Sequence, residues 1–116
     1  MSEVVVIADV QAAPGTGDAV VEAFSAAIAG THREDGCVLY ALHRDNADPD
    51  HFVHIEKYRS QADVDSHMAQ AHTQAIFAWA AEPGRLARPP QLTFLTGLGI
   101  GTPEKGVLQG AGTPAG

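Results

Sequence analysis

The stretch from Phe52 to His72, FVHIEKYRSQADVDSHMAQAH, predicts a strand that passes through a short turn into a helix. Side chains alternate between the two faces of a strand, with a period of two residues. One face of this strand therefore carries a single row of residues: Phe52, His54, Glu56 and Tyr58. Titratable groups occupy positions where a half-buried strand normally carries apolar residues, so this row is the first candidate for function.

The helix that follows has a clear N-terminal signal. Ser60 and Asp63 form a Ser-x-x-Asp pair that resembles a capping box and places an acidic group near the positive end of the helix dipole. The residues beyond it repeat at helical spacing and predict one continuous amphipathic helix: Val64, His67, Met68, Ala71, Ala75, Ile76 and Trp79. Because His67 lies within this apolar stripe, the sequence predicts a buried imidazole.

Three more strands and one more helix are expected outside this stretch. The strands are predicted at residues 4–10, 37–44 and 91–96, and a helix begins near Asp18, the expected N-cap, and ends at about residue 31. The order β-α-β-β-α-β is typical of the α+β ferredoxin-like fold, a four-stranded antiparallel sheet with its helices on one face. Residues 1–96 are the expected domain, and residues 97–116 form a Gly/Pro-rich C-terminal tail.

The faces of the sheet predict an assembly. The first two strands carry apolar residues on both faces, whereas the helices can cover only one. A bare apolar sheet face is not tolerated on a soluble monomer. We therefore expect a homodimer in which two sheets pack together, and the tail either is flexible or lies against the rest of the assembly.

Bulk properties exclude several classes of partner. The 116 residues carry a formal net charge of −7 and no basic run, which argues against binding to nucleic acid or to an anionic membrane. No apolar stretch approaches the roughly 20 residues of a membrane-spanning helix, and no secretory signal is visible. Cys37 is the single cysteine, so no internal disulfide can form, and a cytoplasmic location is expected.

Two segments together resemble the antibiotic biosynthesis monooxygenase (ABM) family. Residues 34–40, EDGCVLY, resemble the opening of that family's second strand. The family pattern F–x–x–x–E–x–W/Y followed by H–x–x–x–x–H is matched by Phe52, Glu56, Tyr58, His67 and His72. The resemblance covers about residues 2–96, and it implies a dimeric α+β barrel. It also implies cofactor-independent oxygenation of phenolic or quinol-type aromatics, or different chemistry on the same scaffold.

One branch of that family is not expected. Its haem-degrading members use an Asn on the first strand and a Trp and a His on the second helix. The matching positions in this chain fall on or next to Ala8, His67 and Phe77. Because the chain departs at all three, haem degradation is not expected.

Neither a metal nor an organic cofactor is expected. His51 and His54 point to opposite faces of their strand. His67 and His72 are about 140° apart around a straight helix, so they cannot hold one ion unless the helix breaks between them. The sequence also lacks a zinc-type His or Cys cluster, a phosphate-binding glycine loop and a flavin or nicotinamide fingerprint.

The leading hypothesis is a cofactor-free monooxygenase that uses O2 to oxidise a small phenolic, quinol or polycyclic aromatic substrate. His67 is assigned as base or proton shuttle, because the ordinary histidine pKa of about 6.5 lies near working pH. Glu56 would orient it, and Tyr58 or His54 would donate a hydrogen bond to the substrate anion. The predicted substrate-binding residues are Phe24, Phe52, Met68, His72 and Trp79.

Two alternatives remain open from the sequence alone. The same base could serve an isomerase or another proton-transfer enzyme that acts on a small metabolite without oxygen. The chain could instead be a non-catalytic, dimeric ligand-binding or stress-associated module. In that case Glu56 would only stabilise the fold, paired with His67, Arg44 or Arg59.

Overall fold

The computed structural model describes residues 2–110, which form four strands and four helices. The strands are β1 (Val4–Gln11), β2 (Cys37–Asp45), β3 (Asp48–Tyr58) and β4 (Gln91–Leu95). The helices are α1 (Gly17–Thr31), α2 (Gln61–Ala69), α3 (Ala71–Ala81) and the short α4 (Pro103–Gly106). None of the helices in this described part of the chain is long and apolar enough to cross a membrane.

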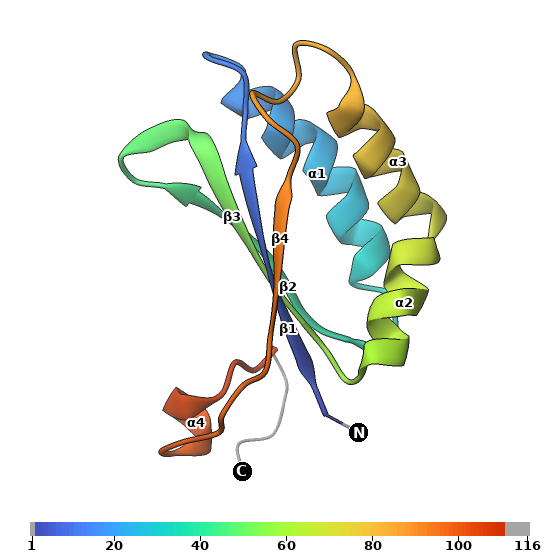
Figure 1. The fold of residues 1–116 in the computed structure, drawn as a ribbon, viewed down its shortest axis with the longest axis vertical. Helices are drawn as coiled ribbons and strands as arrows, with labels where there is room; N and C mark the ends of the chain where they lie inside the picture. Colours follow the sequence, from blue (N-terminus) through green and yellow to red (C-terminus); the bar gives the residue numbers. More distant parts are fainter. Residues whose placement is uncertain (1, 111–116) are drawn as a thin grey trace.

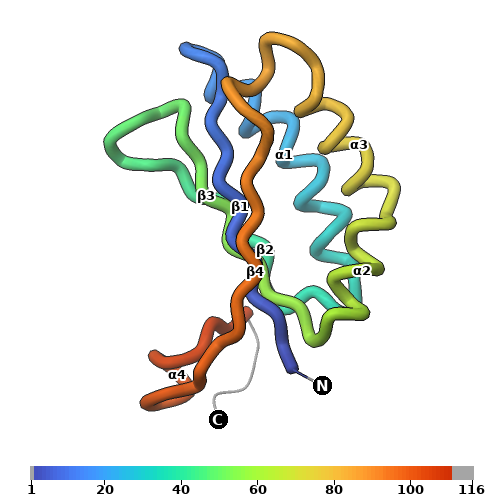
Figure 2. The backbone as a smooth tube through the Cα atoms, in the orientation of Figure 1, coloured from blue at the N-terminus to red at the C-terminus, as the bar shows by residue number. Residues whose placement is uncertain are grey.

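The strands form one antiparallel sheet in the order β2-β3-β1-β4. Helices α1, α2 and α3 all lie against the same face of this sheet (Figure 1). Figure 2 shows α1 and α3 side by side, while the segment after β4 runs to the side of the sheet away from the helices. The predicted α+β ferredoxin-like fold is confirmed.

The register of the sheet places the predicted polar row in the interior. Glu56 lies opposite Val6 of β1 and Tyr40 of β2, and His54 lies opposite Ala8. Phe52, His54, Glu56 and Tyr58 are all buried. Two apolar clusters flank the row: Val10, Ala12, Val20, Phe24 and Phe52 form one, and Val6, Tyr58 and Val64 form the other. The row therefore faces the helices, as the proposed chemistry requires.

The start of α2 agrees with the sequence, but the start of α1 does not. Ser60 is the N-cap of α2, and its hydroxyl accepts a hydrogen bond from the backbone N–H of Asp63. Asp18 was expected to cap α1, yet it lies in the first turn. Asp50 on β3 supplies the acceptor instead, taking hydrogen bonds from the N–H groups of Gly15 and Gly17 at 2.9 Å each. A Cβ atom at Gly17 would collide with the carbonyl of Pro49, so this close approach needs glycine.

The prediction of one continuous second helix is wrong. The helix breaks at Gln70, whose backbone is extended (φ −68°, ψ 147°), and α3 begins at Ala71. The Gln70 N–H still bonds to the His67 carbonyl, and the Gln74 side chain donates to the carbonyl of Met68 at 2.7 Å. Carbonyl groups freed by the break therefore find partners, which makes the break tolerable.

The outer face of the sheet is partly covered by the C-terminal segment. Lys57 is buried on this face, and its Nζ donates to the carbonyl of Leu108 at 2.8 Å and lies 3.1 Å from the Glu3 carboxylate. The C-terminal segment thus contacts the chain's own sheet at Leu108, whereas residues 111–116 lie outside the described part. Large apolar side chains nevertheless remain exposed nearby: Leu95, Leu98, Ile100 and Leu108.

The Asp50 cap gives a first prediction. Asp50→Ala should lower the free energy of unfolding by about 1–2 kcal/mol, because two backbone N–H groups at the start of α1 lose their acceptor. Urea denaturation followed by circular dichroism measures this loss. Asp35→Ala, which removes an exposed carboxylate elsewhere, should change stability by less than about 0.5 kcal/mol. Equal losses in the two variants would contradict the capping role.

A second prediction concerns His51, whose two ring nitrogens lie 2.8 Å from Asp45 and 2.9 Å from Asp9. These two hydrogen bonds raise the His51 pKa above its ordinary value of 6.5, and the bond to Asp45 has the largest effect. The His51 hydrogen bond likewise lowers the pKa of both Asp9 and Asp45 below 3.8. The stabilising contribution of His51 is complete below pH 6.5 and declines as pH rises through its raised pKa. The stabilising contribution of the two carboxylates is complete above pH 3.8 and declines as pH falls through their lowered pKa values.

The stability advantage of the wild type over His51→Gln should therefore be largest between about pH 4 and 6.5 and smaller at pH 8.5. Thermal unfolding across this pH range, at low salt, measures the difference. His43→Gln, at an exposed position on the neighbouring strand, provides the matched control. A His51→Gln difference that does not vary with pH would show that these ion pairs contribute nothing.

Candidate active site

A cavity of about 50 Å³ lies between the sheet and the helices. Its wall is largely apolar, with residues from β1, α1, α3 and β4 such as Val6, Ala8, Phe24, Ile76 and Leu92. Its polar groups are few and come mainly from β2, β3 and α2: Tyr40, His54, Glu56, Tyr58, His67 and Thr73. An apolar hollow with a few converging polar groups is the usual form of a small-molecule site.

The Glu56 carboxylate is buried, and each of its oxygens has a hydrogen-bond partner on the same strand. The Tyr58 hydroxyl donates to Oε1 at 2.6 Å, and His54 Nδ1 lies 3.3 Å from Oε2. All three side chains project from the same face of β3, two residues apart, because that is the period of a strand. A carboxylate removed from water needs such donors, since an unpaired one is costly.

His54 differs from the other site residues in having an unused polar atom. Its Nε2 is buried without a hydrogen-bond partner, while the ring lines the cavity. The imidazole packs edge-on against Tyr40, with ring centroids 3.9 Å apart, and against Phe24 at 6.2 Å. In the neutral ring a proton on Nδ1, shared with Glu56, leaves a lone pair on Nε2. This arrangement leaves an unpaired basic nitrogen on a ring that lines the cavity.

Both tyrosines beside Glu56 are held in the protonated form. Burial, followed by the negative charge of Glu56, raises the pKa of Tyr58 and of Tyr40 well above 10. The hydrogen bond to Glu56 raises the Tyr58 pKa further. Tyr58 therefore acts as a donor to Glu56, and its hydroxyl is not free to donate to a substrate anion.

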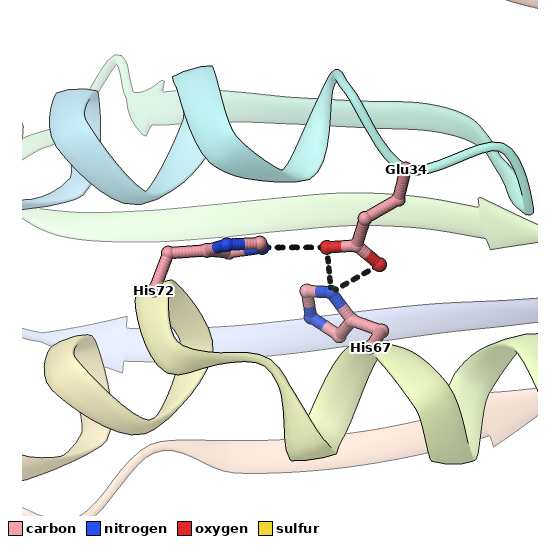
Figure 3. Close-up of side chains that lie close together, drawn as sticks. All are labelled: Glu34, His67 and His72. Atoms are coloured by element: carbon pink, nitrogen blue, oxygen red, sulfur yellow. Dashed lines mark hydrogen bonds and ion pairs between the residues drawn. The ribbon is translucent and has the colours of Figure 1, made fainter.

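His67 has a different carboxylate partner from the one expected. Among the described residues Glu56 makes no hydrogen bond to His67; His67 Nδ1 instead lies 3.0 Å from Glu34 Oε2. The same Glu34 oxygen lies 2.6 Å from His72 Nε2 (Figure 3). Figure 3 shows the Glu34 carboxylate between the two imidazoles, which project from the facing ends of α2 and α3. The break at Gln70 turns His72 toward His67.

The close approach of α1 and α3 also positions this cluster. Gly30 on α1 lies against His72: a Cβ atom there would lie 2.6 Å from His72 Cγ. The cluster thus joins the connection after α1 to the break between α2 and α3. His67 still lines the cavity, with its ring centroid 5.1 Å from that of Tyr58 and 5.4 Å from that of Tyr40.

The expected substrate-binding residues divide into two groups. Phe24 and Met68 line the cavity, as predicted. Phe52 belongs to the packed core beside it, and Trp79 packs against that core and lies over Arg85. His72 is engaged by Glu34 outside the cavity wall. Phe52, Trp79 and His72 therefore do not line the cavity as expected. The helix break and the tight packing of Phe52 place these side chains away from it.

The arginines considered as partners for Glu56 lie elsewhere. Arg44 pairs with Asp18 at 2.9 Å and stacks over the ring of Phe52, and Arg59 pairs with Asp63 at 3.3 Å. His54 and Tyr58 therefore satisfy Glu56 without any cation from an arginine.

Sequence reasoning missed Glu34, Tyr40 and Thr73. The Glu34 position was part of the family resemblance, but its distance from His67 along the chain gave no reason to pair them. Tyr40 lies within the strand predicted at residues 37–44, and its register opposite Glu56 could have suggested the cavity. No glycine or proline marks the break that brings Thr73 to within 3.4 Å of His67 Nδ1.

The cavity reaches the surface on the side of β4. Phe77 on α3 and Phe94 on β4 both line it, and both are more than one-third exposed. These two rings therefore form the rim through which a ligand would enter.

Comparisons with known proteins agree with this fold and site. The family model described as antibiotic biosynthesis monooxygenase matches residues 3–79. A protein named "Putative monooxygenase Rv0793" from Mycobacterium tuberculosis is 35% identical over 98 residues, which cover 84% of this chain and 93% of that protein.

Solved structures show the same architecture. PA3566 from Pseudomonas aeruginosa is 27% identical, with a TM-score of 0.74 over 83% of this chain and 94% of that one. A structure titled "Putative antibiotic biosynthesis monooxygenase" from Nitrosomonas europaea is 24% identical, with a TM-score of 0.77 over 84% and 91% of the two chains, and shares the fold. Together with the family match over residues 3–79, these relationships place the chain in the antibiotic biosynthesis monooxygenase family.

Proposed function

We propose that the protein is a cofactor-independent monooxygenase that oxidises a small phenolic or quinol-type aromatic with O2. The observation that carries this proposal is His54 Nε2, a buried and unpartnered nitrogen on the wall of an apolar cavity. The Glu56 carboxylate lies behind the same imidazole and orients it. Family membership and the monooxygenase name of the Mycobacterium relative support the reaction class.

The proposed chemistry begins with removal of a phenolic proton by His54 Nε2. The resulting phenolate is electron-rich enough to reduce O2 directly. One oxygen atom then bonds to a ring carbon and becomes a carbonyl, as the C–H bond of that carbon breaks, and the other oxygen leaves as water. A phenol and O2 thus give a quinone and water, and the substrate supplies all four electrons.

This assignment changes the expected roles within the site. His67 was the expected base, but its Nδ1 is engaged by Glu34 and its ring forms part of the wall beside Tyr58. Tyr58 positions Glu56, and Glu56 positions His54. A base oriented by a carboxylate is a recurring arrangement in proton-transfer catalysis.

The cavity size favours a single-ring substrate over a polycyclic one. A volume of about 50 Å³ has room for only a few water molecules. An aromatic ring therefore requires the rim side chains Phe77 and Phe94 to rotate outward, and a larger ring system requires more displacement.

We also propose that the active form is a homodimer. Four large apolar side chains between residues 95 and 108 are exposed on one protomer: Leu95, Leu98, Ile100 and Leu108. A second copy packed on this side would remove them from water. Sedimentation of the purified protein tests this assembly.

The base assignment is tested by oxygen uptake with a panel of phenols and hydroquinones. His54→Gln should reduce the rate roughly 100-fold or more, because it removes the proton acceptor while retaining similar bulk. His51→Gln is the matched control, since His51 lies on the opposite face of the same strand and should retain full activity. Full activity in His54→Gln, together with loss of activity in His67→Gln, would contradict this assignment and identify His67 as the base.

The same panel of compounds, assayed with and without oxygen, separates the alternative functions. Substrate isomerisation or proton exchange without oxygen, abolished by His54→Gln, would favour a proton-transfer enzyme. Tight ligand binding with no turnover under either condition would favour a binding module.

Tyr58→Phe tests the positioning role. The change leaves Glu56 Oε1 without its short hydrogen bond, so the free energy of unfolding should fall by about 1–3 kcal/mol. The rate at saturating substrate should also fall, because Glu56 no longer holds His54 firmly. In a Glu56→Met background the added Tyr58→Phe change should cost less, as measured by a double-mutant cycle. Strict additivity of the two changes would contradict this coupling.

A further inference from the structure

Three potential metal ligands meet beside the cavity. Glu34 follows α1, His67 lies in the last turn of α2, and His72 lies in the first turn of α3. One possible ligand atom from each residue lies within 4.8 Å of the other two, and the three side chains point toward one another (Figure 3). The condition that excluded a metal on sequence grounds was a continuous helix, and the break at Gln70 removes it.

We propose that Glu34, His67 and His72 bind one divalent transition-metal ion, with Zn²⁺ as the representative. Two imidazole nitrogens and one carboxylate oxygen are a donor set that zinc takes in proteins. The same set suits other first-row transition ions, whereas Mg²⁺ and Ca²⁺ prefer oxygen ligands alone.

The distances are close to those that an ion requires. Ligands about 2.0–2.2 Å from zinc in a tetrahedral site lie roughly 3.3 Å from one another. Glu34 Oε2 lies 3.0 Å from His67 Nδ1 and 2.6 Å from His72 Nε2, so a small widening of the cluster admits the ion. Each imidazole then carries its proton on the nitrogen that faces away from the metal, and the hydrogen bonds to Glu34 are replaced by bonds to the ion.

Burial gives the site one fixed wall and one open side. The His67 side chain is 5% exposed, whereas those of Glu34 and His72 are 12% and 23% exposed. An ion can therefore enter past His72, and water can fill the remaining coordination position. Three protein ligands with one open position are also the ligand count of many catalytic zinc sites.

A second histidine–carboxylate group in the molecule provides a contrast. His51 also contacts two carboxylates, but Asp45 binds its Nδ1 and Asp9 binds its Nε2. These nitrogens lie on different sides of the ring, so the two carboxylates cannot share an ion with it. His51 is therefore a matched control for the proposed site.

The proposed metal ligands are neither the base nor the positioning residues of the proposed oxygenation. Glu34 and His72 lie outside the row of His54, Glu56 and Tyr58, and His67 lines the cavity without serving as the base. Failure of one proposal therefore does not decide the other.

The test is calorimetric titration of chelator-treated protein with ZnCl2, together with thermal unfolding. The wild type should bind one Zn²⁺ per chain, and its Tm should rise with zinc concentration because the ion binds the folded state. Glu34→Gln and His72→Ala should each weaken binding by at least about 10-fold, the loss that even outer partners of a ligand can cause. His51→Ala should bind zinc as the wild type does, and Mg²⁺ should not compete.

Imidazole NMR signals of the wild type provide a readout that does not depend on a variant folding. Stoichiometric Zn²⁺ should shift the ring signals of His67 and His72 and leave those of His51 and His54 in place. No zinc binding by the wild type, unchanged affinity in both ligand variants, or shifts confined to other histidines would each overturn the proposal.

Discussion

The structure depends on keeping one carboxylate, that of Glu56, away from water. A buried carboxylate is tolerated only with hydrogen-bond donors in good geometry. β3 provides both donors from its own face, because Tyr58 and His54 flank Glu56 at a spacing of two residues. The sheet and helices must then close over this row, and the closure produces the apolar cavity against which His54 lies.

Two separate imidazole–carboxylate pairs result from this packing. His54 is hydrogen-bonded to Glu56 on the sheet, and His67 is hydrogen-bonded to Glu34 on the helical side. The ring of Tyr40 contacts both imidazoles, with centroids 3.9 Å from His54 and 5.4 Å from His67. The two histidines of the cavity wall therefore have different electrostatic surroundings, and this difference supports giving them different tasks.

Local patterns in the sequence were sufficient for the fold and for half of the site. The alternation along β3 predicted that Phe52, His54, Glu56 and Tyr58 share one face, and Ser60 with Asp63 predicted the start of α2. Both are short-range effects that a strand or a first helical turn imposes on its own residues. The pairing of Glu34 with His67 and the cap that Asp50 gives to α1 depend on segments that meet only after folding. The break at Gln70 has no glycine or proline to mark it, and the carbonyl groups of His67 and Met68 take their donors from the backbone of Gln70 and the side chain of Gln74.

Lys57 has a consequence for the homodimer that we propose. Its ammonium is buried on the outer sheet face, where it binds the carbonyl of Leu108 and faces the carboxylate of Glu3. The segment around Leu108 therefore acts as a strap across part of that face. In the proposed homodimer a second copy would meet this strap as well as the sheet, so substitutions near Leu108 would alter self-association while the interior that surrounds Glu56 keeps its form.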